Sequence, residues 1–185
     1  GNLIIPDSVT IIGDGAFSGC SGFAGGLTIP DSVTTIGEWA FYNCYSFIGD
    51  LIIPDGVTTI GEWAFCNCSG FTGGLTIPDS VTTIGNYAFQ CCSKLSKNLV
   101  IPNSVTTIGD YAFYGCGFTG DLIIPESVTI IGRMSFSYCT GLTAVFIPAA
   151  VQTMEATNTS YSQFYDCSSN LVIYCEAESK PDGWG

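Results

Sequence analysis

Apolar and polar residues follow a pattern that returns every 23 or 24 residues along this chain. The phrase IPDSVTTIG begins at Ile29, and close copies begin at five other isoleucines: Ile5, Ile53, Ile77, Ile101 and Ile124. A repeat of this length is typical of solenoids, in which each copy forms one coil of a stack. The pattern therefore predicts a single elongated array of coils.

Three columns of identical residues support this interpretation. Seven of the eight prolines follow the repeat: Pro6, Pro30, Pro54, Pro78, Pro102, Pro125 and Pro148. Six cysteines and six phenylalanines do the same: Cys20, Cys44, Cys68, Cys92, Cys116 and Cys139, with Phe17, Phe41, Phe65, Phe89, Phe113 and Phe136. One coil cannot be stable alone, because ordering it costs about 1.5 kcal/mol per residue while each large buried side chain contributes roughly 1.5–3 kcal/mol. Stacking is therefore required, and it should bring successive Phe side chains into contact.

Local patterns predict the elements of each coil. The triplet LII at 51–53 alternates residues of high β-propensity and predicts a short strand, which Pro54 ends because its nitrogen cannot donate to a ladder. The segment VTTI predicts a second, shorter and less regular strand on the opposite wall. The segment EWAFCNC predicts a single 3₁₀ turn with Phe65 and Cys68 pointing inward. A glycine column between these two segments predicts a corner with positive φ: Gly13, Gly37, Gly61, Gly85, Gly109 and Gly132.

The charge balance excludes several classes of partner. Sixteen acidic residues give a formal net charge of -12, and the basic residues are Lys94, Lys97, Arg133 and Lys180. A nucleic-acid-binding protein needs a basic face to neutralise phosphates, so nucleic acids and anionic membrane surfaces are poor partners. No apolar run approaches the 18 or more residues of a membrane-spanning helix, and membrane insertion is not expected.

Residue types suited to catalysis or metal binding are scarce. The chain has no histidine, which removes Ser-His and Cys-His pairs, and neither a cofactor nor a metal is expected. The cysteines lack zinc spacing, so their column predicts free buried thiols. Cys66 and Cys91 lie outside the column and can be partly exposed, while Cys167 and Cys175 are the candidates for a disulfide.

Acidic residues also form a column, directly after each proline: Asp7, Asp31, Asp55, Asp79, Asn103 and Glu126. Stacked carboxylates suggest calcium, which takes six to eight oxygen ligands. A single line of carboxylates cannot surround an ion, so solvated turns are the favoured interpretation.

Two outward columns are candidate partner-binding surfaces. The first, hereafter the stripe, follows the concave strand wall: Ile4, Thr28, Ile52, Thr76, Val100, Ile123, Phe146 and Val172. An exposed apolar patch often marks an interaction site, although β-propensity alone would also produce one. The second choice is the aromatic column, which Met134 continues: Trp39, Trp63, Tyr87 and Tyr111. These rings either bind a sugar or protein or, as the favoured alternative, pack on one another.

The order of strand, corner, turn and return, with a Cys at the end of the turn, resembles the leucine-rich-repeat plan. The segment CYSFIGDLIIPDGVTTIGEWAFCNC, from Cys44 to Cys68, resembles the BspA-like (Treponema pallidum-type) class. The resemblance implies a right-handed β-solenoid of low curvature, with about 7.5 coils over residues 1–175 and a capping tail over 176–185. Coil seven departs from the pattern, because five extra residues between Met154 and Phe164 should bulge outward.

The same resemblance implies a function. Proteins of this class are secreted or lie at the cell surface, which indicates a non-catalytic adhesion module that binds a host matrix protein, another cell-surface protein or a glycan. A structural spacer that presents another domain is the alternative, and a glycan-active enzyme is a weaker one. The sequence does not indicate an oligomeric state.

Overall fold

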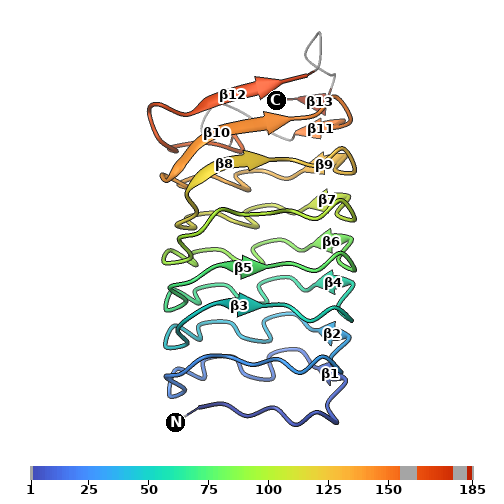
Figure 1. The fold of residues 1–185 in the computed structure, drawn as a ribbon, viewed down its shortest axis with the longest axis vertical. Coiled ribbons are helices and arrows are strands. Elements are labelled where there is room, and N and C mark those ends of the chain that lie inside the picture. Colours follow the sequence, from blue (N-terminus) through green and yellow to red (C-terminus); the bar gives the residue numbers. More distant parts are fainter. Residues whose placement is uncertain (1, 155–161, 177–182, 185) are drawn as a thin grey trace.

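The computed structural model describes residues 2–154, 162–176 and 183–184, which form a parallel β-solenoid (Figure 1). The coils stack along a nearly straight axis, with the two ends of the chain at opposite ends of the stack (Figure 1). Strands β1 to β13 are separated by turns, and the described residues include no helix. The predicted solenoid of low curvature is therefore confirmed.

One wall is a continuous parallel sheet of eight short strands in the order β1-β2-β4-β6-β7-β9-β11-β13. It is built from successive copies of the VTTI segment and their equivalents. Its strands are β1 (Ile11–Ile12), β2 (Thr35–Ile36), β4 (Thr59–Ile60), β6 (Thr83–Ile84), β7 (Thr107–Ile108), β9 (Ile130–Ile131), β11 (Thr153–Met154) and β13 (Gly183–Trp184). In this ladder Ile36 pairs directly with Ile60, Ile60 with Ile84, and Ile84 with Ile108. Each of these coils is therefore joined to the coil before it and the coil after it.

The other wall carries the Leu-x-Ile-Pro segments and is interrupted. Strands β3 (Leu51–Ile52) and β5 (Leu75–Thr76) form a two-stranded sheet. Strands β8 (Gly120–Ile123), β10 (Leu142–Ile147) and β12 (Val172–Cys175) form a three-stranded sheet in the order β12-β10-β8. The prediction that the VTTI wall is the less regular one is therefore wrong.

The position of proline explains the difference between the two walls. A proline follows directly after the isoleucine of every such segment of the interrupted wall up to Ile147, and its nitrogen cannot extend the ladder. The VTTI segments hold no proline, and their threonines add bonds between coils. The hydroxyl groups of Thr82 and Thr106 donate to the carbonyl oxygens of Thr58 and Thr82 at 3.3 Å.

Between the walls lies a core of stacked aromatic rings. The ring centroids of Phe41 and Phe65 are 5.1 Å apart, and those of Phe65 and Phe89 are 5.5 Å apart, with interplanar angles of 8° and 4°. A second column places Phe47 against Phe71 at 5.9 Å. These side chains are fully buried, which confirms that equivalent Phe residues of successive coils contact one another.

The turn segment is not the predicted 3₁₀ turn. The N–H groups of Ala40 and Tyr42 do donate to the carbonyl three residues earlier, at 3.4 and 3.1 Å. The N–H groups of Trp39 and Phe41 instead donate to the next coil at 2.9 and 2.8 Å, and φ is 52° at Trp39 and 59° at Asn43. The segment is thus a series of β-turns whose N–H groups bond alternately within the coil and to the following coil.

The glycine column also differs from the prediction, because positive φ occurs at other glycines: Gly15, Gly19, Gly49, Gly115 and Gly120. The column is needed instead for close approach of neighbouring backbones. A Cβ at Gly61 would lie 2.7 Å from the carbonyl oxygen of Gly37, and one at Gly85 would lie 2.8 Å from the carbonyl oxygen of Ile60. Real Cβ atoms do not approach backbone this closely, so the coils could not stack at this spacing with any other residue.

The cysteine column forms a ladder of thiol donors. The Sγ atoms of Cys68 and Cys92 donate to the carbonyl oxygens of Phe41 and Phe65, one coil earlier, at 3.1 and 3.2 Å. Cys167 is a further member of this column, since its thiol donates to a phenylalanine carbonyl at 3.1 Å. All ten cysteines are free, which confirms the prediction of unbonded column thiols and shows that the candidate disulfide of Cys167 does not form.

Burial keeps these thiols protonated. It raises the pKa of Cys44 to about 11 and that of Cys66 to about 12, and it raises the pKa of Cys139 as well. Outside the column, Cys66 is buried with its Sγ 3.4 Å from Oε1 of Gln90, whereas Cys91 is half-buried. A protonated thiol can donate a hydrogen bond, so the column links each coil to the previous one at neutral pH.

Two predictions concern the C-terminal part of the chain. The predicted outward bulge between Met154 and Phe164 lies mostly outside the described residues, which leave out 155–161. In the tail, β13 pairs in parallel with β11 and lengthens the eight-stranded sheet.

Candidate functional site

The stripe follows the wall of Leu-x-Ile-Pro segments as an exposed line of side chains. Ile52 is 57% exposed, Val100 67%, Ile123 65% and Phe146 39%. Thr28, one coil before Ile52, and Thr76, between Ile52 and Val100, are exposed as well. The strand register aligns Ile52 with Thr76 and Ile123 with Phe146. Because side chains alternate in direction along a strand, the leucine and isoleucine on either side of the stripe residues from Thr28 to Ile123 are buried in the core, as are Val145 and Ile147 beside Phe146.

The stripe ends in a pair of aromatic rings. Strand β12 pairs with β10 so that Tyr174 lies beside Phe146 and Val172 lies beside Ala144. The rings of Phe146 and Tyr174 stack with centroids 4.7 Å apart and an interplanar angle of 8°. Tyr174 therefore continues the stripe in place of Val172, the residue that the repeat spacing had predicted.

Two hollows flank this end of the stripe. One of about 230 Å³ lies between Val100 and Ile123, and one of about 250 Å³ lies among Ile123, Phe146 and Tyr174. Carboxylates border both hollows, since Asp121 lines the first and Glu126 and Glu176 line the second. The surface thus combines apolar side chains with an acidic border.

The aromatic column lies on the turn segments. Trp63 stacks on Tyr87 with centroids 3.9 Å apart, and Tyr87 stacks on Tyr111 at 4.9 Å, both with an interplanar angle of 8°. Burial raises the pKa of Tyr87. These three rings pack on one another as the favoured alternative predicted, whereas Trp39 at the end of the column is 46% exposed.

Every member of this column has a left-handed backbone. The φ angles are 52° at Trp39, 58° at Trp63, 57° at Tyr87, 56° at Tyr111 and 50° at Met134. This region is uncommon for residues other than glycine, asparagine and aspartate, and it is unfavourable for bulky side chains. The column therefore has large side chains at positions whose positive φ favours glycine.

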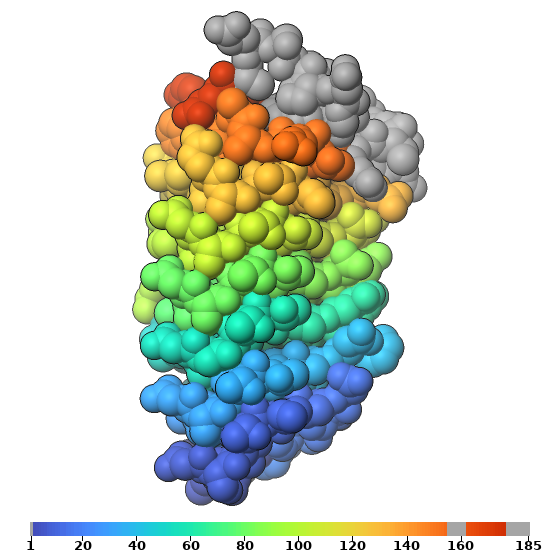
Figure 2. Space-filling view, turned by 90° about the vertical axis from the view of Figure 1, so that its right-hand side faces the viewer, coloured from blue at the N-terminus to red at the C-terminus, as the bar shows by residue number. Residues whose placement is uncertain are grey.

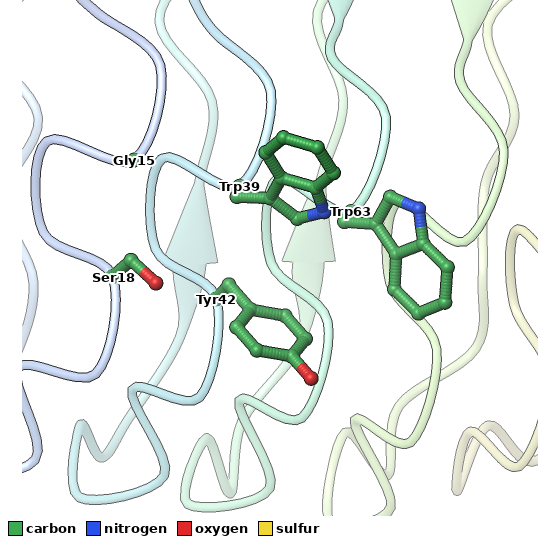
Figure 3. A pocket seen from close by; sticks show the side chains of 5 residues that line it. All are labelled: Gly15, Ser18, Trp39, Tyr42 and Trp63. Atoms are coloured by element: carbon green, nitrogen blue, oxygen red, sulfur yellow. The ribbon is translucent and has the colours of Figure 1, made fainter.

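A hollow of about 440 Å³ lies at the N-terminal end of the aromatic column, lined by Gly15, Ser18, Trp39, Tyr42 and Trp63. Figure 3 shows the rings of Trp39, Tyr42 and Trp63 projecting from two successive coils, with Gly15 and Ser18 on the preceding coil. Tyr42 and Trp63 meet edge to face, with centroids 6.2 Å apart and an interplanar angle of 80°. Sequence columns alone did not indicate this hollow.

The acidic column and the ion pair of Lys97 with Asp50 lie at the surface. The column from Asp7 to Glu126 is exposed at each turn, and no group of three or more His, Cys, Asp or Glu side chains among the described residues could hold a metal ion. Lys97 bonds to Asp50 at 2.8 Å, and this hydrogen bond lowers the pKa of the Asp50 carboxyl. Within the described residues, no helix is long and apolar enough to span a membrane.

The long face seen in Figure 2 shows coils stacked as successive bands without a break between neighbours.

A sequence profile described as BspA type leucine rich repeat region matches residues 1–73 and 72–177, with six copies. A comparison with curated protein sequences gives no match.

The chain resembles several solved structures of leucine-rich repeat proteins. A leucine rich repeat protein of T. pallidum is 30% identical, with 78% of this chain and 64% of its own length covered and a TM-score of 0.66. A leucine rich cell surface protein of Faecalibacterium prausnitzii is 26% identical, with 94% and 53% covered and a TM-score of 0.67. A leucine-rich repeat protein of Bacteroides ovatus is 31% identical, with 92% and 54% covered and a TM-score of 0.51.

The chain spans about half to two thirds of the length of these relatives. The profile covers nearly all of the repeats, and the names of the similar solved structures describe them as leucine rich proteins. The chain therefore belongs to the BspA type leucine-rich repeat family.

Proposed function

We propose that this chain is a non-catalytic, extracellular adhesion module that binds a protein or a glycan through the stripe. Leucine-rich repeat families supply protein-binding or surface modules, and the relative from F. prausnitzii is a cell surface protein by name. The partner is then a host matrix protein, another cell-surface protein or a surface glycan.

The observation that carries this proposal is the exposed apolar line on a strongly acidic molecule. Ile52, Val100 and Ile123 are each more than half exposed, although the chain is strongly acidic, with a net charge of -12. Apolar side chains therefore occupy solvent-exposed positions of this wall. A contiguous apolar patch with a polar border is typical of an interaction site. The stacked pair of Phe146 and Tyr174 adds aromatic residues, which are enriched at binding hot spots.

The test replaces Ile52, Ile123 and Phe146 with Asp in one variant. Binding of the purified chain to immobilised extracellular-matrix proteins and to a glycan array should fall at least about tenfold, because each Asp introduces a charge that must be desolvated in the complex. Circular dichroism and the melting temperature check that the outward positions tolerate the change.

A matched control carries the same added charge elsewhere. Tyr45, Ile48 and Ile130 are also exposed apolar residues, and none of them lies on the stripe. Replacing these three with Asp should leave binding within about twofold, since exposed charges separated by more than a Debye length are largely screened. Equal losses in both variants, or no loss in the stripe variant, would reject this face.

A spacer that presents another domain is the alternative function. The straight stack and the continuous eight-stranded ladder favour it, because both resist bending (Figure 1). A spacer predicts that no probe on either panel binds the wild-type chain.

A further inference from the structure

The hollow beside Trp39 exists because coil one departs from coil two at two equivalent positions. Gly15 stands where coil two has Trp39, and Ser18 stands where coil two has Tyr42. The small residues of coil one leave the large rings of coil two without a neighbour on that side. Trp63 of the third coil completes the wall, so three aromatic rings line one space (Figure 3).

The geometry of the rings favours a compact ligand. Tyr42 and Trp63 meet edge to face at 80°, so the aromatic lining of the hollow is not one flat platform. A flat sugar ring stacks best on one platform, whereas a compact group can contact the faces of rings that meet at an angle. Trp63 is held in place by Tyr87, which stacks behind it at 3.9 Å, and by a bond from its Nε1 to Oε1 of Glu62 at 3.0 Å.

The backbone places these rings outward at a conformational cost. Trp39 and Trp63 have φ angles of 52° and 58°, in a region that side chains of L-residues rarely adopt. Gly15 has φ of 61° at the same position of coil one, so the fold itself accepts glycine there. Tyr87 and Tyr111 have the same left-handed φ, so this turn conformation is shared by the column and does not by itself mark the hollow.

Charge selects the sign of the ligand. The first basic residue of the chain is Lys94, and the 93 residues before it hold eight carboxylates: Asp7, Asp14, Asp31, Glu38, Asp50, Asp55, Glu62 and Asp79. Two of these directly precede the tryptophans, since Glu38 adjoins Trp39 and Glu62 adjoins Trp63. No basic residue belongs to the three coils that line the hollow, and both tryptophans adjoin a glutamate, so a cation is a better ligand here than an anion.

We propose that this hollow binds a quaternary ammonium group through cation–π contacts with Trp39, Tyr42 and Trp63. Ring faces attract such cations, and the remaining volume accommodates the chain that carries the ammonium group. This site goes beyond the proposed adhesive function, because it uses different residues from the stripe and has its own ligand. Choline and a trimethylated lysine both carry this chemistry.

Isothermal titration and tryptophan fluorescence of the wild-type chain test the proposal. Tetramethylammonium, choline and trimethyllysine should bind, and 3,3-dimethylbutan-1-ol, the neutral isostere of choline, should bind at least about tenfold more weakly. Affinity for the cations should fall as salt rises. The ratio of the affinities for choline and trimethyllysine distinguishes a small-molecule ligand from a modified peptide. The proposal would be overturned if the neutral isostere bound as tightly as choline, if cellobiose bound more tightly than choline, or if none of the cations bound.

Three variants localise the site. Trp39→Gly removes one ring at a position whose backbone suits glycine, and it should weaken choline binding at least about tenfold. Gly15→Trp adds a ring on the Gly15 side of the hollow and removes none, and choline binding should again be lost. A Cβ at Gly15 has its nearest neighbour at 4.0 Å, and Trp39 and Trp63 hold tryptophan at a similar φ, although this φ makes the substitution strained. Tyr111→Gly, at φ of 56° in the same column but away from the hollow, should leave binding unchanged.

Unchanged binding in Trp39→Gly and Gly15→Trp, or an equal loss in Tyr111→Gly, would contradict the assignment. The melting temperature of each variant shows whether a loss reflects unfolding. The stripe variant with Asp at 52, 123 and 146 should still bind choline, so the failure of one function remains separate from the failure of the other.

Discussion

Replacing Gly85 with Ala tests why the glycine column exists. A Cβ at Gly85 would lie 2.8 Å from the carbonyl oxygen of Ile60 and 2.9 Å from the nitrogen of Glu62. Both atoms belong to the backbone of the preceding coil, so no side chain can move aside. The coils must separate by roughly half an ångström to reach an ordinary contact, and the bond from the N–H of Gly85 to the oxygen of Ile60, now 3.0 Å, must lengthen.

The expected cost follows from three contributions. Overpacking a tightly packed site costs typically about 1–3 kcal/mol. A weakened hydrogen bond between coils adds about 1 kcal/mol, while the lower conformational entropy of unfolded Ala offsets about 0.4–1 kcal/mol. The net loss is about 1–3.5 kcal/mol. Because each coil contacts only its neighbours, this loss falls on the interface between the third and fourth coils and should reduce the cooperativity of unfolding.

The end of the stack provides the control. Gly13 occupies the same column in coil one, and a Cβ there meets no atom within 4 Å. Gly13→Ala should therefore stabilise the chain slightly, by up to about 1 kcal/mol. Urea unfolding under reducing conditions, followed by circular dichroism, measures both variants. A Gly85→Ala variant within about 0.5 kcal/mol of wild type, or an equal loss in Gly13→Ala, would refute the steric argument.

Three further predictions concern the thiols. Burial raises the pKa of Cys44 to about 11 and that of Cys66 to about 12, against 9.0 in the unfolded chain, so the protonated thiols stabilise the fold fully below pH 9 and lose this effect as pH rises toward 11–12. Urea unfolding measured from pH 8 to 10.5 should show the free energy of unfolding falling by about 2 kcal/mol per thiol. A free energy that does not change with pH would contradict this. Iodoacetamide should modify exposed Cys175 well before buried Cys68 in the native chain, as peptide mass spectrometry can follow. Cys68→Ala should cost about 1–3 kcal/mol in urea unfolding because it removes the donor to the carbonyl of Phe41, and a change under about 0.5 kcal/mol would show that the ladder contributes little.

The sequence determines which residues are equivalent, and this was enough to predict the solenoid. Periodicity places Phe41, Phe65 and Phe89 in one column, and close packing of neighbouring coils then requires their contact. Periodicity does not determine backbone torsion angles. A conserved spacing of glycine is compatible with either a left-handed corner or a close backbone approach, and here positive φ occurs two residues later, at Trp39 and its equivalents. The bulky rings at those positions concealed the left-handed turn.

Alternation along the strands predicted the outward direction of the stripe, and Ile52, Val100 and Ile123 are exposed as expected. The last strand was predicted with the wrong register because it lacks the Ile-Pro pair that marks the strand end in the other coils. Aligning Cys175 with Ile147 places Tyr174 beside Phe146, and only the three-dimensional pairing reveals this alignment.

The hollow shows how a repeat protein can hold a single site. A column of identical residues offers the same surface at every coil, and its rings satisfy one another, as Trp63, Tyr87 and Tyr111 do by stacking. A small ligand instead needs a place where the column is broken and a ring face has no neighbour. Gly15 provides that break, so restoring the repeat with Gly15→Trp should keep the fold and remove the site, whereas Gly85→Ala should weaken the fold and leave the ring geometry of the first two coils intact. Stability and binding in this chain therefore depend on opposite properties of the sequence: stability on equivalence between coils, and binding on the positions where equivalence fails.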